Sequence, residues 1–241
     1  VREAGTTSLE KGKTFYTSNA GLKELRYEIS RYLERKYQMV YHPDHEILVT
    51  VGGSEGIDAA MRSILNPGDE VIVAQPCFVS YLPCIIMADG KPVIVNLREE
   101  DKFKLKREQL EEKLTDKTKA VFISYPNNPT GAVMTREDLE PIAEFVQEHD
   151  LIVISDEIYS ELTYGRDHVS IGSLPGMKDR TLIINGFSKA FAMTGWRLGY
   201  VAGPRVIMEQ MTKVHQFCIM AAPTTSQYAA IEAMRSCDDE V

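Results

Sequence analysis

The sequence predicts an α/β fold, because three features of the chain agree. Short apolar runs alternate with helical patterns, an order typical of α/β rather than α+β proteins. The breaks between them are short, and no repeat, low-complexity tract or Pro/Gly/Ser-rich linker interrupts the alternation. With 241 residues, of which 44% are hydrophobic, the chain can bury one sizeable core. We therefore expect one domain over residues 1–241.

The elements follow in order from the apolar periodicity. Residues 21–38 carry apolar side chains at helical spacing with charges on the opposite face, which predicts an amphipathic helix. Seven apolar runs are candidate strands, at residues 47–51, 71–74, 93–97, 120–123, 151–154, 181–184 and 198–202. Four further helices fit between the strands, at residues 55–65, 107–113, 136–149 and 206–217.

Charge and cysteine content narrow the range of partners. Lys and Arg number 27 against 35 Asp and Glu, and the net charge of −8 argues against nucleic acid or an anionic membrane as the main partner. The four cysteines form no CxxC pair, and no segment resembles a signal peptide or a long apolar span. We therefore expect a reduced, cytoplasmic protein whose partner is a small molecule.

Lys189 is the strongest candidate catalytic residue. It lies in Asn185-Gly186-Phe187-Ser188-Lys189, directly after the predicted strand 181–184, and ligand sites of open α/β sheets lie at such strand ends. Partly apolar surroundings and the nearby Arg197 would favour the neutral amine, which can form a Schiff base with an aldehyde. Pyridoxal phosphate is therefore the cofactor to test, although an isolated Ser-Lys pair is usually an ordinary surface feature.

A glycine turn offers a phosphate site. Val51-Gly52-Gly53-Ser54-Glu55-Gly56 joins a predicted strand to a predicted helix, so the free amides of the helix start and the Ser54 hydroxyl could hold a phosphate dianion. The other interpretation is a plain turn in which Ser54 caps the helix. The segment lacks the GxGxxG spacing and gives no support for a nicotinamide dinucleotide.

Polar or aromatic side chains follow three more predicted strands. Asn128 lies in a rigid turn, residues 124–131, and can donate an amide hydrogen to a ring oxygen. Asp156 follows the very apolar run 151–154, where a carboxylate needs a cationic partner such as a protonated pyridine nitrogen. An apolar strand ending in Asp-Glu also resembles the magnesium-binding strand of phosphate-loop NTPases, but no GxxxxGK[ST] occurs. Phe78 can stack on a flat cofactor or belong to the core.

Together these segments resemble the class I and II aminotransferases, fold type I of the pyridoxal-phosphate enzymes. The motifs are Gly52-Gly53-Ser54, Asn128-Pro129-Thr130-Gly131, Asp156-Glu157-Ile158-Tyr159 and Ser188-Lys189 through Gly195-Trp196-Arg197-Leu198-Gly199. Their order and spacing agree with the family as well as their residue types, and the resemblance covers residues 16–230. It implies a three-layer α/β/α sandwich whose seven-stranded sheet is mostly parallel, with the last strand antiparallel.

The resemblance implies catalytic roles for residues from three motifs. Lys189 would form the Schiff base with pyridoxal phosphate and then shuttle the proton between the substrate α-carbon and the cofactor. Asp156 would keep the pyridine nitrogen protonated. Tyr159 and Asn128 would hydrogen-bond the phenolic oxygen of the cofactor and stabilise its anion.

The implied phosphate ligands come from separate segments. They are the backbone of Gly53 and Ser54, the Ser188 hydroxyl and Arg197. Charge-assisted bonds contribute roughly 1.5–3 kcal/mol each, so several of them anchor a cofactor even after ordering costs. Phe78 would cover the cofactor ring.

Two further segments bear on partners and metals. Tyr16 matches the tyrosine that in this family reaches the phosphate of the neighbouring subunit, so the resemblance implies a homodimer. The run His42-Pro43-Asp44-His45 could suggest a metal, but adjacent loop histidines are more often solvated, and we expect no metal.

The chain departs from the family pattern in two ways. The position three before the lysine, often a phosphate-binding serine, is Gly186, so one hydroxyl contact is lost. The family's small C-terminal domain, which supplies the arginine for the substrate carboxylate, and its N-terminal segment are absent from residues 1–241. Because the chain begins at Val1 without a methionine and stops in Cys237-Asp238-Asp239-Glu240-Val241, we expect the large, cofactor-binding part of a longer protein, inactive alone.

Three functions are compatible with these motifs. The leading hypothesis is an aminotransferase of aspartate or aromatic type, which moves an amino group from an L-amino acid to a 2-oxo acid. A carbon–sulfur β-lyase on the same fold is the nearest competitor, and it would release pyruvate and ammonia from cystathionine without a keto-acid acceptor. A ligand-sensing domain of a transcription regulator would need a DNA-binding unit, and no basic helix-turn-helix pattern precedes Tyr16.

Overall fold

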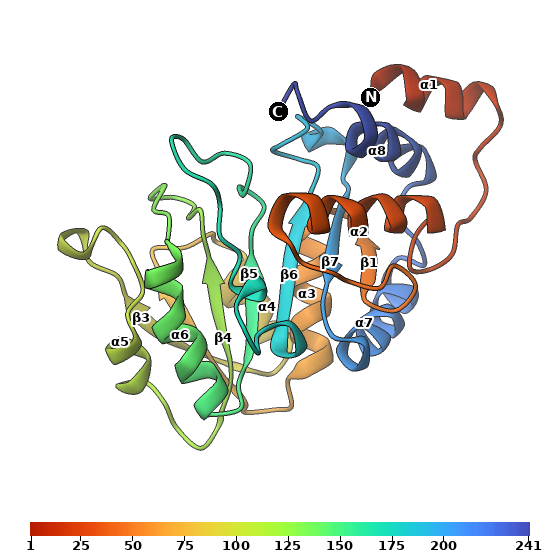
Figure 1. Cartoon of the computed structure of the whole chain (residues 1–241). Helices are drawn as coiled ribbons and strands as arrows, with labels where there is room; N and C mark the ends of the chain where they lie inside the picture. Colours follow the sequence, from red (N-terminus) through yellow and green to blue (C-terminus); the bar gives the residue numbers. More distant parts are fainter.

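A computed structural model describes all residues 1–241 and shows one seven-stranded sheet covered by helices on both faces (Figure 1). The strand order is β1-β7-β6-β5-β4-β2-β3. The strands are β1 Ile47–Thr50, β2 Glu70–Gln75, β3 Lys91–Asn96, β4 Thr118–Ser124, β5 Ile152–Asp156, β6 Thr181–Gly186 and β7 Gly199–Ala202. The predicted α/β fold and all seven predicted strands are confirmed.

The sheet is parallel except at one strand. The pairs β2 with β3, β2 with β4, β4 with β5, and β5 with β6 are parallel, whereas β7 runs antiparallel between β1 and β6. Gly199, the first residue of β7, pairs with Thr50 on one side and with Gly186 on the other. The carboxyl ends of β1 and β6 therefore meet at the edge of the sheet where β4 and β5 also end.

Eight helices complete the chain. They are α1 Arg2–Glu10, α2 Lys23–Tyr37, α3 Gly52–Ile64, α4 Tyr81–Met87, α5 Arg107–Glu111, α6 Arg136–Glu148, α7 Arg205–Cys218 and α8 Thr224–Ser236. Short 3₁₀ turns lie at Glu99–Asp101, Ile171–Ser173, Lys178–Arg180 and Thr194–Trp196. One face of the sheet packs on α2, α5, α6 and α8 and the other on α3, α4 and α7, which gives the three predicted layers (Figure 1). No helix combines the length and the apolar character that a membrane span requires.

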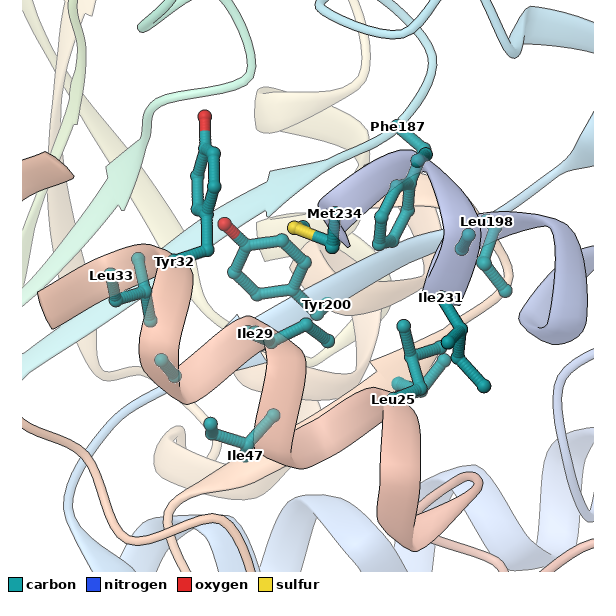
Figure 2. Packing of buried hydrophobic residues seen from close by; sticks show 14 of the residues in the cluster. Leu25, Ile29, Tyr32, Leu33, Ile47, Phe187, Leu198, Tyr200, Ile231 and Met234 are labelled. Atoms are coloured by element: carbon teal, nitrogen blue, oxygen red, sulfur yellow. The ribbon is translucent and has the colours of Figure 1, made fainter. Parts of the chain in front are cut away.

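The core beside β7 shows how α2 is held. Its helical stripe of apolar side chains faces the sheet, as the sequence periodicity predicts. Figure 2 shows this stripe beside Tyr200 of β7, with side chains of α8 closing the cluster. The residues drawn from α2, α8 and the strands include Leu25, Ile29, Leu33, Ile47, Ile231 and Met234, all fully or almost fully buried.

Three helices were not predicted, and one begins earlier than expected. The buried positions of α8 are mostly small, among them Ala229, Ala230 and Ala233, so their hydrophobic contrast with the exposed face is weak. The short α4 carries Pro83, and α1 contains few apolar residues. Helix α3 begins at Gly52 instead of Glu55, because the glycine turn itself forms the first helical turn.

Candidate active site

One cavity of about 290 Å³ opens at the edge of the sheet where β4, β5 and β6 end. Nine of the ten predicted site residues line it: Gly53, Ser54, Phe78, Asn128, Asp156, Tyr159, Ser188, Lys189 and Arg197. The lining is completed by Ile57, Tyr81, Ile158 and Thr194. A second, more open hollow of about 490 Å³ also includes Asn128 and Tyr159, so the two spaces adjoin.

Asp156 is the last residue of β5 and is almost fully buried. Its Oδ2 atom accepts a hydrogen bond of 2.7 Å from the Tyr81 hydroxyl, and its Oδ1 atom accepts one of 3.2 Å from the Ile158 amide. Burial raises the pKa of Asp156, and the two hydrogen bonds partly offset that rise by favouring the carboxylate. No cationic side chain pairs with this carboxylate, so the site holds a buried acid with room for a positive partner.

The neighbouring carboxylate, Glu157, makes structural hydrogen bonds and does not line the cavity. It is fully buried and accepts hydrogen bonds from the hydroxyls of Ser155 and Ser170 at 2.8 and 2.7 Å. Its Oε2 atom lies 2.9 Å from Nε2 of His168. All of these contacts lie away from the cavity, so Glu157 ties the chain after β5 to the sheet and leaves Asp156 as the acid that faces the cavity.

Lys189 lies in the turn after β6, at the mouth of the cavity. Its Nζ atom is 5.4 Å from the centre of the Tyr159 ring, and it takes part in no ion pair. The side chain is exposed, so its surroundings are less apolar than the sequence led us to expect. The exposure is local to Lys189, since Phe187 and Met193 in the same turn are fully buried.

Tyr159 and Asn128 meet across the cavity. The Nδ2 atom of Asn128 donates to the Tyr159 hydroxyl over 3.4 Å. Asn128 is placed by its neighbour Asn127, whose side-chain oxygen accepts hydrogen bonds from the amide and the hydroxyl of Thr130. The two polar groups therefore converge from different loops on one place in the cavity, where both can donate to a ligand oxygen.

An anion subsite lies where α3 begins. Gly52 adopts a positive φ of +75°, and Gly199 comes so close that a Cβ atom on it would lie 2.7 Å from the Gly52 carbonyl carbon and 2.9 Å from the Gly53 nitrogen. Helix starts present free amides, which favour anions. The Nη2 atom of Arg197 lies over Gly52, since a Cβ atom there would be 2.7 Å from it. Arg197 itself has a left-handed φ of +51° and forms no ion pair.

The interpretation of Ser54 as a helix cap is wrong. Val51 occupies the cap position of α3, and no side chain hydrogen-bonds to the helix start from there. Ser54 is instead an exposed residue in the first turn of α3 and lines the cavity. Its hydroxyl is thus available to a ligand.

Gly186 has a structural reason to lack a side chain. A Cβ atom at this position would lie 2.8 Å from the Gly199 Cα atom and 3.0 Å from the Leu198 carbonyl oxygen. Both neighbours are backbone atoms, one in β7 and one in the residue before it, and they cannot rotate away. The missing hydroxyl is therefore coupled to the tight pairing of β6 with β7.

Sequence reasoning missed Tyr81, which contacts Asp156 from the first turn of α4. Its ring stacks on Phe122 with centroids 4.1 Å apart, and Phe78 approaches it edge to face at 5.8 Å. A buried tyrosine in an apolar segment looks like an ordinary core residue, and only its hydroxyl contact sets it apart.

Tyr16 and the histidine pair lie outside the cavity. Tyr16 is 81% exposed and lies in a shallow hollow formed by residues 14–17 and 221–224. His42 and His45 stack on each other with centroids 4.3 Å apart, and the structure contains no group of three or more side chains that could hold a metal ion. Neither segment adds a side chain to the cavity of its own chain.

Comparisons with known proteins agree with this arrangement. The family model for aminotransferase class I and II matches residues 1–240. The putative aminotransferase YugH of Bacillus subtilis is 51% identical over all of this chain, and an aspartate aminotransferase of Pyrococcus abyssi is 46% identical over 98% of it. The solved aromatic aminotransferase of Pyrococcus horikoshii superposes with a TM-score of 0.96 at 47% identity, over 98% of this chain and 63% of that one.

The chain spans 62% of the Bacillus subtilis relative and 61% of the Pyrococcus abyssi relative. The match nevertheless runs the full width of the sheet and includes every segment around the cavity. The protein belongs to the aminotransferase class I and II family.

Proposed function

We propose that this chain binds pyridoxal phosphate and carries the cofactor site of an enzyme that transfers an amino group from an L-amino acid to a 2-oxo acid. The observation that supports the proposal most directly is the convergence of a lysine, a buried carboxylate and a positively charged anion subsite on one cavity. These three groups come from the ends of different strands, as binding groups do in open α/β sheets.

The residues fit this cofactor at two ends. The free amides of Gly53 and Ser54, with the Arg197 guanidinium, make an end that suits a phosphate dianion. The buried carboxylate of Asp156, which has no cationic partner in the chain, makes an end that suits a protonated ring nitrogen. Lys189 enters the same cavity with its amine over the Tyr159 ring.

Each side chain then has a defined task. When bound, pyridoxal phosphate supplies an aldehyde carbon for the amine and a ring that accepts electrons. The Lys189 Nζ atom would hold the cofactor, and as a base it would accept the proton that leaves the substrate α-carbon. Asp156 would keep the ring nitrogen protonated, and Tyr81 fixes the orientation of its carboxylate. Tyr159 and Asn128, which already lie within hydrogen-bond distance of each other, would donate to the ring oxygen, and Phe78 would cover the ring.

We further propose that residues 1–241 form the large, cofactor-binding domain, and that groups outside these residues bind the substrate carboxylate. Two relatives are named for aspartate and for aromatic amino acids, and we propose substrates of these types. The exposed Tyr16 supports a homodimer in which it reaches the phosphate of the neighbouring subunit. We place the enzyme in the cytoplasm, because the chain is acidic and its cysteines are unpaired.

Borohydride trapping tests the cofactor site. The protein is mixed with pyridoxal phosphate, reduced and digested, and the modified peptide is identified by mass spectrometry. We expect one reduced pyridoxyl group, on Lys189, and none in the Lys189→Ala variant. The control is Lys178→Ala, which removes another lysine that lies away from the cavity and should leave the labelling unchanged. Labelling spread over several lysines would contradict the proposal.

The reaction is tested on the full-length protein with a panel of amino acids. We expect keto acid to form from aspartate or aromatic amino acids only when a 2-oxo acid acceptor is added. Pyruvate and ammonia released from cystathionine without an acceptor would instead identify a β-lyase.

A further inference from the structure

A hydrogen bond between a buried histidine and a partly buried glutamate lies next to the anion subsite. His215, on α7, is fully buried, and its Nδ1 atom lies 3.1 Å from Oε1 of Glu55. The other carboxylate oxygen, Oε2, accepts a hydrogen bond of 3.1 Å from the Val51 amide. Glu55 thus connects the residue before the glycine turn to a helix that lies far away in the sequence.

The hydrogen bonds assign the proton of the imidazole. A carboxylate only accepts, so the proton that His215 shares with Glu55 lies on Nδ1. The Nε2 atom is buried without any partner, and an N–H group there would remain unsatisfied. His215 therefore acts as a donor to Glu55 through one nitrogen only.

The position of Glu55 makes this contact relevant to a bound anion. It follows Gly53 and Ser54, which line the cavity, but its own carboxylate does not. A free carboxylate at this position would repel a phosphate and compete with it for the Arg197 guanidinium, which lies over Gly52. The two hydrogen bonds hold the carboxylate back from the cavity.

We propose that His215 and Glu55 are positioning residues for the anion subsite. The buried imidazole holds the Glu55 carboxylate on the Val51 amide, and this keeps both the turn and Arg197 available to a phosphate. The inference rests on the proposed cofactor site, and it adds two residues that do not touch the cavity.

Dissociation constants for pyridoxal phosphate and for pyridoxal, which lacks the phosphate, test the inference in the full-length protein. His215→Leu removes the hydrogen-bond donor and fills the buried position with an apolar side chain. We expect it to weaken pyridoxal phosphate binding between about threefold and tenfold, the size of a charge interaction near a helix terminus, and to leave pyridoxal binding nearly unchanged. His215→Asn, whose amide can donate from near the Nδ1 position, should restore most of the affinity.

Removal of the charge separates this role from simple packing. In the double variant His215→Leu/Glu55→Gln no carboxylate is released, so the affinity for pyridoxal phosphate should return toward that of the wild type. Equal weakening of both ligands in His215→Leu, or no recovery in the double variant, would overturn the inference and leave the proposed function intact. A wild-type protein that binds neither pyridoxal phosphate nor inorganic phosphate would overturn the proposed function and this inference together.

Discussion

The hydroxyl of Tyr81 donates a hydrogen bond of 2.7 Å to Oδ2 of Asp156, which joins the first turn of α4 to the end of β5. The same hydroxyl lies 2.9 Å from Oγ of Ser124 on β4. One tyrosine therefore links two neighbouring strands of the parallel sheet at the edge where they end. It also satisfies half of the carboxylate that faces the cavity.

Replacing Tyr81 should lower the stability of the protein, because the buried carboxylate of Asp156 loses a hydrogen bond. In Tyr81→Phe, the Asp156 carboxylate keeps only the Ile158 amide as a donor, and we expect the free energy of unfolding at neutral pH to fall by about 1–3 kcal/mol. Urea unfolding of the cofactor-free protein measures this loss. In an Asp156→Asn background the same replacement should lower the free energy of unfolding by clearly less. An equal loss of stability in both backgrounds would mean that the hydrogen bond between Tyr81 and Asp156 contributes little.

Stability should depend on pH through Asp156. Its pKa is raised in the folded protein, mainly by burial, so the folded state holds a proton that the unfolded state has released. The cofactor-free protein should therefore lose stability as pH rises from the ordinary carboxyl pKa of about 3.9 toward the raised value. Asp156→Asn should flatten this decline. Urea unfolding midpoints of both proteins are measured across that pH interval. An equal dependence of the midpoint on pH in the two proteins would refute the prediction.

A serine at position 186 should not restore a phosphate contact. In Gly186→Ser the new Cβ atom would press on the backbone of Gly199 and Leu198, and overpacking of this kind typically costs about 1–3 kcal/mol. We expect a lower thermal midpoint and no tighter binding of pyridoxal phosphate. Gly195→Ser is the matched control, because a Cβ atom there meets nothing within 4 Å. Tighter binding without loss of stability in Gly186→Ser would show that the strands adjust.

Tyr16 should contribute to cofactor binding although it lies outside the cavity of its own chain. If it reaches the phosphate of a second subunit, Tyr16→Phe weakens pyridoxal phosphate binding by roughly tenfold to a hundredfold through loss of one hydrogen bond to a charged group. Tyr27→Phe is the control, because Tyr27 is also exposed and lines neither the cavity, the hollow beside it nor the hollow at Tyr16. Sedimentation of both variants checks that the assembly is unchanged. An unaltered affinity in Tyr16→Phe would remove this tyrosine from the site.

The sequence predicts the strands and the site segments well, for a physical reason. Buried parallel strands are short apolar runs, and polar residues directly after them gather at one edge, so Asp156 and Lys189 could be placed from local pattern alone. The family resemblance then supplied the roles. A local sequence pattern does not predict which side chains from distant segments contact each other.

Tyr81 and the pair of Glu55 with His215 show that limit. Each looks like a core or surface residue in its own segment, and the pair is separated by 160 positions in the sequence. The exposure of Lys189 was not predicted for a related reason, since the local pattern does not show which side chains of the turn after β6 pack inward and which face outward. Helix α8 was not predicted because its small side chains pack as closely as large ones but give only a weak hydrophobic periodicity in the sequence.

The place of Gly199 between Thr50 and Gly186 has a consequence for how the protein matures. A chain emerging from the ribosome makes the glycine turn early, yet that turn meets its partners only after β7 has inserted between two strands already synthesised. If the chain binds pyridoxal phosphate as proposed, only chains with a complete sheet would bind it, and incomplete chains would not. At a concentration a hundredfold above its dissociation constant, a ligand that binds only the finished state stabilises it by about 2.7 kcal/mol, so cofactor supply would influence how much of the newly made protein survives.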